Sequence, residues 1–245
     1  MKNKIFQDDG RAFVLAVDHP LTMPSPDLAD ISHVLSEAVG GGVDSVLAGY
    51  GCLKHFASIL SGVGRILRAD CGATTLSRPV GPLKLLYGPE DAIRVGADAL
   101  MCMGFPGSAV NAATLEHVAK TATGAHAAGI LAGAEMLPYG FEKPQDVDTR
   151  SVANVSFACR LGAEMGADFI KTEFVGGQGF REVVANCFVP VLVLGGSRAK
   201  SESELLAEVS EAMDAGASGV IIGRNIARSS DIAGLCRKIH DIVHA

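Results

Sequence analysis

Short apolar runs alternate with longer amphipathic stretches from one end of the chain to the other. A short apolar run is typical of a buried parallel strand, and a longer stretch with helical spacing predicts a helix. The predicted strands span residues 13–18, 44–48, 65–69, 99–103, 130–135, 168–171, 189–194 and 219–222. The predicted helices span residues 27–40, 51–60, 89–95, 109–127, 148–165, 178–185, 201–215 and 231–244. Eight such units predict an α/β fold of the (β/α)8 TIM barrel type.

A short motif recurs where four predicted helices end and the second, fourth, sixth and eighth strands begin. Its copies are Gly42-Val43-Asp44, Gly96-Ala97-Asp98, Gly166-Ala167-Asp168 and Gly216-Ala217-Ser218. Glycine suits the left-handed backbone that follows a helix C-terminus. Either the barrel is built from doubled units, or loops of this kind simply favour these residues. Both interpretations place the motif at the end of the barrel where the strands begin.

The length of 245 residues is typical of one such barrel, and no Pro/Ser-rich linker divides the chain. We therefore predict a single domain spanning residues 1–245. The least regular part is the connection 70–89 after the third strand, whose length predicts a functional loop.

Charge and cysteine usage exclude several classes of protein. The net charge is −6 and no basic cluster is present, so we expect no nucleic-acid partner. No apolar run approaches the roughly 18 residues of a membrane span, and the N-terminus lacks the apolar stretch of a signal peptide. The six cysteines include no CxxC pair and are typical of reduced thiols in a cytoplasmic protein.

Lys171 is the most informative residue, because it ends the predicted sixth strand. Burying a lysine is costly, and burial favours the free amine, which can attack a carbonyl to form a Schiff base. Alternatively, the lysine reaches solvent or pairs with a carboxylate. Glu173 lies two residues further on and would favour the charged ammonium, so we expect it to point away or to bind a third group.

Further polar residues stand at the other strand ends, where active sites of this fold lie. Asp18, Glu135 and Tyr139 are the candidates for acid/base chemistry. His19 is either a proton carrier or a hydrogen-bonded structural residue. Arg68 and Asp70 follow the third strand.

The ends of the last two strands predict a phosphate site. Gly195, Gly196, Ser197, Gly223 and Arg224 offer backbone N–H groups, a hydroxyl and a guanidinium at the usual phosphate position of these barrels. Alternatively, both segments are ordinary turns and Arg224 is a surface charge.

A catalytic metal needs about three convergent ligands, and we expect neither a metal nor a cofactor. The histidines other than His19 suggest no such set; they are His33, His55, His117, His126, His240 and His244. Activation of a carbonyl is therefore assigned to the lysine.

Five segments resemble the archaeal-type class I fructose-bisphosphate aldolases, part of the deoxyribose-phosphate aldolase/tagatose-bisphosphate aldolase-like superfamily of Schiff-base barrels. They are Ala16-Val17-Asp18-His19, Gly72-Ala73-Thr74-Thr75-Leu76, Ile170-Lys171-Thr172, Gly195-Gly196-Ser197 and Gly223-Arg224-Asn225. The resemblance implies that Lys171 forms the Schiff base, that Asp18 handles protons and that the glycine loops hold a phosphate. It also implies a phosphorylated sugar as substrate and a homo-oligomer.

The fifth strand departs from the pattern of that family, which has Trp-x-Tyr-Pro-Arg-Gly. With the prolines aligned, Leu137 stands at the tyrosine and Tyr139 at the arginine. Glu135 is similar to the glutamate of the tagatose-bisphosphate branch. The identity of the proton donor therefore stays open.

The function expected from these features is a class I aldolase that cleaves or forms a ketose phosphate such as fructose 1,6-bisphosphate. One alternative is a transaldolase-type synthase or an acyltransferase on the same scaffold. The other is a phosphosugar-binding barrel without catalysis.

Overall fold

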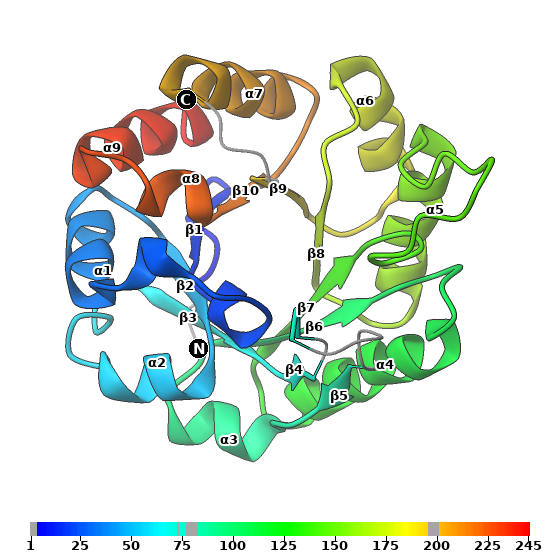
Figure 1. Ribbon diagram of the computed structural model, residues 1–245, viewed down its shortest axis with the longest axis horizontal. Helices are drawn as coiled ribbons and strands as arrows, with labels where there is room; N and C mark the ends of the chain where they lie inside the picture. The colour runs from blue at the N-terminus through cyan, green and yellow to red at the C-terminus, as the bar shows by residue number, and fades with distance from the viewer. Residues whose placement is uncertain (1–3, 73, 77–82, 196–200) are drawn as a thin grey trace.

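The computed structural model describes residues 4–72, 74–76, 83–195 and 201–245. Within these residues, eight parallel strands close into a barrel in the order β1-β10-β9-β8-β7-β6-β3-β2, with helices around it (Figure 1). The barrel strands are β1 (Ala12–Ala16), β2 (Ser45–Ala48), β3 (Gly64–Arg68), β6 (Ala99–Gly104), β7 (Leu131–Met136), β8 (Phe169–Thr172), β9 (Val191–Leu194) and β10 (Gly219–Ile222). The predicted (β/α)8 barrel is confirmed.

The helices follow the predicted order, with one addition. They are α1 (Ile31–Gly40), α2 (Tyr50–His55), α3 (Pro89–Arg94), α4 (Asn111–Ala127), α5 (Val152–Glu164), α6 (Gly177–Asn186), α7 (Glu202–Asp214), α8 (Arg224–Ala227) and α9 (Ile232–Val243). The additional helix is α8, and two 3-10 turns span His19–Leu21 and Pro26–Leu28. None of the helices in the described part of the chain is long and apolar enough to cross a membrane.

Two helices begin later than predicted because of their caps. The side chain of Asp30 accepts the N–H of His33, so α1 begins at residue 31 rather than 27. Ser151 accepts the N–H of Asn154, so α5 begins at residue 152 rather than 148.

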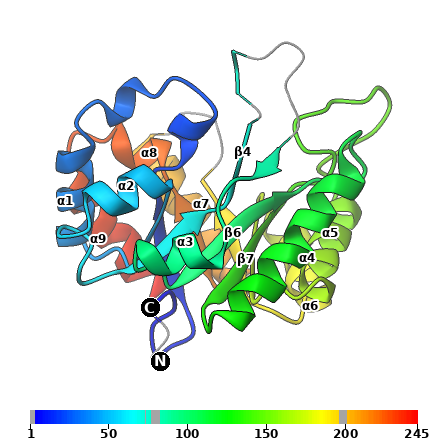
Figure 2. The same cartoon turned by 90° about the horizontal axis from the view of Figure 1, so that it is seen from below.

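The long connection after β3 contains a short antiparallel pair, β4 (Asp70–Cys71) and β5 (Lys84–Leu85). Figure 2 shows β4 at one end of the barrel and the C-terminus at the other. The C-terminus therefore lies at the end where the strands begin, and β4 lies at the end where they finish.

Alternation along the strands separates two apolar layers. Val14, Ile66 and Phe169 belong to the cluster inside the barrel, whereas Phe13 and Ile170 belong to the layer between the strands and the helices. A strand places every second side chain on the same face. Continuing the inward series beyond the apolar residues leads to positions 18, 68, 135 and 171 at the C-terminal ends of the strands.

The repeated motif forms the same pair of hydrogen bonds in three of its copies. The backbone N–H of Asp44 donates to the carbonyl of Phe13 over 2.9 Å, and its carboxylate accepts the N–H of Phe13 over 2.6 Å. The other two such pairs are Asp98 with Arg65 (2.8 and 3.0 Å) and Asp168 with Ala132 (2.7 and 2.7 Å). Each aspartate thereby joins the start of its strand to the preceding barrel strand. Ser218, in the fourth copy, donates its N–H to the carbonyl of Val191.

Candidate active site

A cavity of about 550 Å³ opens at the C-terminal ends of the barrel strands. Most of the predicted site residues that the structure describes line it, and these are Asp18, His19, Glu135, Lys171, Gly195, Gly223 and Arg224. The inward alternation along β1, β7 and β8 and just beyond β1 brings Asp18, Glu135 and Lys171 together although they lie far apart in the sequence.

Lys171 lies on β8 directly beside Glu135 of β7. Its Nζ is 3.0 Å from Oε1 of Glu135, and the residue is only 7% exposed. The hydroxyl of Thr172 donates to the carbonyl of Met136 over 2.9 Å and fixes the two strand ends to one another. The lysine therefore pairs with a carboxylate inside the cavity and does not extend into solvent.

Arg68 occupies the centre of the charged cluster and is 2% exposed. Its Nε donates to Oδ2 of Asp18 over 2.8 Å, and its Nη2 donates to Oε2 of Glu135. Nη1 lies 3.6 Å from Oδ1 of Asp70. One guanidinium thus holds carboxylates from three strand ends. The sequence places Arg68 after the third strand but indicates no role for it. Its inward orientation follows from alternation two positions after Ile66.

The cluster keeps two of its carboxylates ionised. Burial opposes ionisation of Asp18, but Arg68 and Lys171 outweigh it and hold the pKa of Asp18 below its usual value. Burial likewise opposes ionisation of Glu135, and Lys171 and Arg68 hold its pKa below the usual value. Burial dominates at Asp70 despite Arg68 and raises its pKa to about 6. Near neutral pH, two carboxylates able to accept protons therefore face Lys171.

His19 and Glu173 line the cavity, but each contacts a charged residue outside the cluster around Arg68. Burial lowers the pKa of His19, although Asp27 and Asp18 oppose the change, and its Nε2 lies 3.4 Å from Oδ2 of Asp27. Glu173 forms an ion pair with Arg150, which confirms the expectation that it binds a group other than the lysine.

Tyr139 lies in a turn next to Gly140, which lines the cavity, and its assignment as an acid/base candidate stays a prediction. Its backbone has φ 59°, in the left-handed region, and its N–H donates to the carbonyl of Pro106. This turn places the ring against Gly107, and Tyr139 is not among the described residues that line the cavity.

The predicted phosphate site is described only in part. Gly195, Gly223 and Arg224 line the cavity, whereas Gly196 and Ser197 lie outside the described residues. Nδ2 of Asn225 donates to the carbonyl of Gly195 over 3.1 Å and joins the two segments. A Cβ on Gly223 would lie 2.1 Å from the carbonyl oxygen of Ala16, so the close packing of β1 already requires glycine there.

Comparison with known proteins agrees with this architecture. The family model described as DeoC/LacD family aldolase matches residues 12–229. The chain is 33% identical to the 2-amino-3,7-dideoxy-D-threo-hept-6-ulosonate synthase 1 of Archaeoglobus fulgidus over 236 residues, which cover 96% of this chain and 87% of that protein.

Two solved structures show the same fold at similar length. One comes from an analysis of reaction intermediates of the Schiff base-forming fructose-1,6-bisphosphate aldolase, with a TM-score of 0.88 and 28% identity, covering 98% of this chain and 96% of that one. The other is an archaeal fructose-1,6-bisphosphate aldolase with its catalytic lysine covalently bound to a carbinolamine intermediate, with a TM-score of 0.89 and 26% identity, covering 98% and 97%. The chain belongs to the DeoC/LacD family of aldolases and is an enzyme of carbon–carbon bond chemistry.

Proposed function

We propose that this enzyme is a class I aldolase that forms or cleaves a carbon–carbon bond of a ketose phosphate through a Schiff base on Lys171. The observation that carries the proposal is the buried amine of Lys171, 3.0 Å from Glu135 inside the cavity. Lys143 also lines the cavity but is exposed on a loop. The solved relative whose catalytic lysine forms a carbinolamine supports the same chemistry.

The proposed reaction begins when the free amine of Lys171 attacks the substrate ketone and water is lost, leaving an iminium ion. Glu135 exchanges a proton with the amine, because the two side chains are in direct contact. In the cleavage direction, Asp18 takes the proton from the hydroxyl on the carbon that leaves. The electrons of the broken carbon–carbon bond enter the iminium to give an enamine, and an aldehyde departs. Protonation of the enamine and hydrolysis of the resulting iminium then release the second product and restore the amine.

Arg68 has a positioning role in this scheme. It donates to Asp18 and Glu135 at once, so both carboxylates remain ionised and fixed relative to Lys171. The proposed phosphate contacts come from Arg224 and the glycine segments at the ends of β9 and β10, which line the same cavity.

Covalent trapping tests the proposal directly. The protein is incubated with dihydroxyacetone phosphate or fructose 1,6-bisphosphate, borohydride is added, and intact mass and peptide mass are measured. We expect an adduct on Lys171 that Lys171→Met abolishes while the circular dichroism spectrum stays unchanged. Lys143→Met is the matched control, a second lysine of the cavity whose loss should leave trapping intact. Turnover by Lys171→Met would contradict the mechanism. Saturable sugar-phosphate binding without trapping would instead favour the non-catalytic barrel.

A second candidate is a transaldolase-type synthase on the same scaffold, and the identity of 33% to a protein named as a synthase favours keeping it. The two functions differ in whether a second substrate is required. An aldolase releases aldehyde from a ketose phosphate alone, whereas a synthase consumes the ketose phosphate at a useful rate only with an acceptor aldehyde. We also propose a cytoplasmic location, as expected from the cysteine usage, and a homo-oligomer, as expected from the family resemblance. Light scattering tests the oligomeric state.

A further inference from the structure

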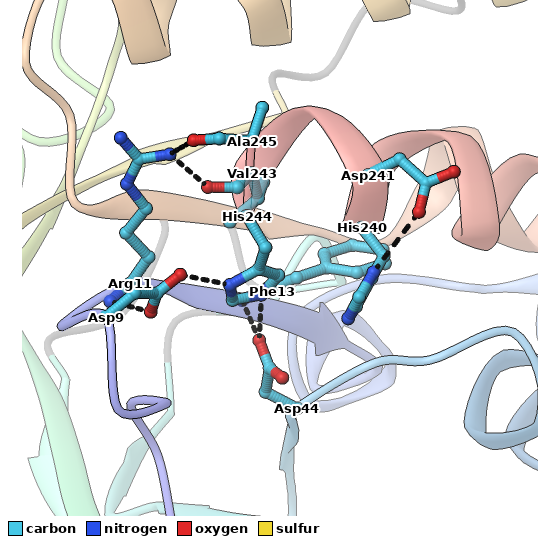
Figure 3. Close-up of polar contacts among 9 residues, drawn as sticks. All are labelled: Asp9, Arg11, Phe13, Asp44, His240, Asp241, Val243, His244 and Ala245. Carbon is cyan, nitrogen blue, oxygen red and sulfur yellow. Dashed lines mark hydrogen bonds and ion pairs between the residues drawn. The ribbon is translucent and has the colours of Figure 1, made fainter.

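A second cluster of ligand-type side chains, drawn in Figure 3, includes Asp44 and so lies at the opposite end of the barrel, where the strands begin. His240 and His244 stand one turn apart on and just after α9, and Asp44 precedes β2. One ligand atom from each of the three residues lies within 4.8 Å of the other two. The spacing of the histidines by four residues is the sequence signal that argues against the expected absence of a metal.

The side chain of His244 is held between two carboxylates. Its Nε2 is 3.0 Å from Oδ2 of Asp44, and its Nδ1 is 2.7 Å from Oδ2 of Asp9. Nδ1 of His240 likewise lies 3.5 Å from Oδ1 of Asp241. Histidines that bind metals commonly donate one ring N–H to a carboxylate, which orients the ring and leaves the other nitrogen for the ion. Both histidines here have a carboxylate beside Nδ1.

The surroundings fix Asp44 and His244 before any ion binds. The carboxylate of Asp44 accepts the N–H of Phe13 over 2.6 Å, and its side chain is 5% exposed. Nη1 of Arg11 donates to the carbonyls of Val243 and Ala245, each over 2.8 Å, and so fixes the end of the chain that carries His244. Asp9 accepts the N–H of Arg11 over 2.8 Å. The N-terminal segment, the start of β2 and the end of α9 therefore meet at one preformed point (Figure 3).

We propose that Asp44, His240 and His244 form a binding site for a divalent transition-metal ion of the zinc type, with solvent at the fourth position. Two imidazoles and a carboxylate suit zinc rather than magnesium or calcium, which prefer oxygen ligands. Ligand atoms of a tetrahedral zinc ion lie about 3.3 Å apart, close to the separation of His244 and Asp44 here. With the ring N–H of His244 on Nδ1, beside Asp9, the lone pair of Nε2 is available to the ion.

Local charge also favours a cation at this position. Three carboxylates surround the site, those of Asp9, Asp44 and Asp241, and one guanidinium, that of Arg11, is near them. The guanidinium is occupied by the two backbone carbonyls of the chain end. With neutral imidazoles the drawn cluster has an excess of negative charge, which a divalent ion neutralises.

The position of the site indicates a structural role for the ion. It lies at the end of the barrel that does not carry the active site, and its ligands come from residues separated by about 200 positions. An ion there joins α9 to the start of β2 and stabilises the folded chain by binding it in preference to the unfolded chain.

The test uses zinc chloride as the only added ligand. The full-length protein is treated with a chelator, dialysed and titrated with zinc by calorimetry, and its melting temperature is measured with and without zinc. We expect one ion per chain, a higher melting temperature with zinc, and an affinity at least about tenfold lower in His240→Ala. His240 is the ligand chosen for substitution because its side chain is 39% exposed, so that its truncation removes less buried contact than truncation of His244 or Asp44.

His126→Ala is the matched control. Nε2 of His126 lies 3.0 Å from Oδ2 of Asp168, so this variant removes an equivalent His–Asp pair on the third copy of the motif. It should leave zinc affinity unchanged. Absence of saturable zinc binding by the native protein, or equal affinity in His240→Ala, would overturn the proposal. X-ray absorption of the zinc-loaded native protein gives an independent result, since fewer than two imidazole ligands would also overturn it.

Discussion

Asp70 differs from the other carboxylates of the active-site cluster because burial dominates its ionisation. Oδ2 accepts the N–H of Met103 over 2.8 Å, whereas Oδ1 is 3.6 Å from the nearest guanidinium nitrogen of Arg68. Arg68 makes direct hydrogen bonds to Asp18 and Glu135 instead. Arg68 therefore stabilises the ionised form of Asp70 less than those of Asp18 and Glu135. Burial raises the pKa of Asp70 to about 6.

This shift predicts how stability depends on pH. The folded protein binds a proton at Asp70 more tightly than the unfolded chain, whose pKa is near 3.8. The contribution is therefore fully present below about pH 4 and is lost as pH rises through about 6, with a slope of at most about 1.4 kcal/mol per unit. Asp18 and Glu135 have lowered pKa values and act in the opposite sense, but only below their usual values.

Asp70→Asn isolates this effect. Asparagine retains an acceptor for Met103 and cannot ionise, so the variant should lose less stability than the native protein between pH 5 and pH 7. Urea unfolding at the two pH values gives the comparison. Identical losses in both proteins would show that Asp70 does not titrate in this range.

Individual residues of the site differed in how well the sequence predicted them. Lys171 and Glu135 could be found because each ends an apolar run and the fold places strand ends together. The bonds of Arg68 join it to residues 50 and 67 positions away, and no local pattern contains that pairing. Tyr139 was predicted from its position after the fifth strand, whereas the direction of its side chain depends on a left-handed backbone turn that no local pattern contains.

At the scale of elements, the repeated Gly-x-Asp motif acts as a joint between neighbouring strands. In three copies the aspartate exchanges two hydrogen bonds with one residue of the preceding barrel strand. The glycines Gly42, Gly96 and Gly166 have φ values of 93°, 64° and 96°, which favour glycine and turn the chain from helix to strand. A shared structural task thus accounts for the motif whether or not the barrel arose by duplication.

The copy of the motif that contains Asp98 is the best one for testing the strand joint. Asp44 and Asp168 in the other two copies each contact a histidine, which would complicate the result. Asp98→Ala leaves the N–H of Arg65 without its acceptor and should lower the free energy of unfolding by about 1–3 kcal/mol. Asp98→Asn keeps an acceptor oxygen and should recover most of that loss. Urea unfolding measures both variants, and equal stability of Asp98→Ala and the native protein would show that the joint contributes nothing.

The sequence predicted the helices and strands well where the hydrophobic pattern extends over enough residues to be recognised. Each predicted barrel strand overlaps an observed one, because a closed barrel requires every strand to be apolar. The sequence did not predict β4, β5 or α8, which have two, two and four residues. Elements this short have no period to detect, and tertiary contacts determine them.

At the scale of the whole molecule, the two ends of the barrel carry different features. The C-terminal ends carry the cavity with Lys171, and the N-terminal ends carry the strand joints and the histidine cluster. In barrels of this type, the first end supports catalysis and the second supports stability. Substitutions at the two ends should therefore affect different measurements.

Arg224 provides the prediction for the catalytic end. It begins α8 and lines the cavity beside Gly223, where the proposal places the substrate phosphate. A guanidinium bound equally to phosphate in the ground and transition states contributes about 1.5–3 kcal/mol. Arg224→Ala should then raise KM for a ketose phosphate by roughly 10- to 100-fold while kcat changes little.

Steady-state kinetics on a ketose phosphate and on the same ketose without phosphate separate this role from a general disturbance of the site. The unphosphorylated ketose has no group for Arg224 to bind, so its kcat/KM should be similar in the variant and the native enzyme. Zinc affinity should also be unchanged, because the histidine cluster contains Asp44 at the start of β2 and so lies at the other end of the barrel. An unchanged KM for the phosphorylated substrate would remove Arg224 from the phosphate site. An equal loss with both substrates would instead mean that Arg224 supports the shape of the cavity.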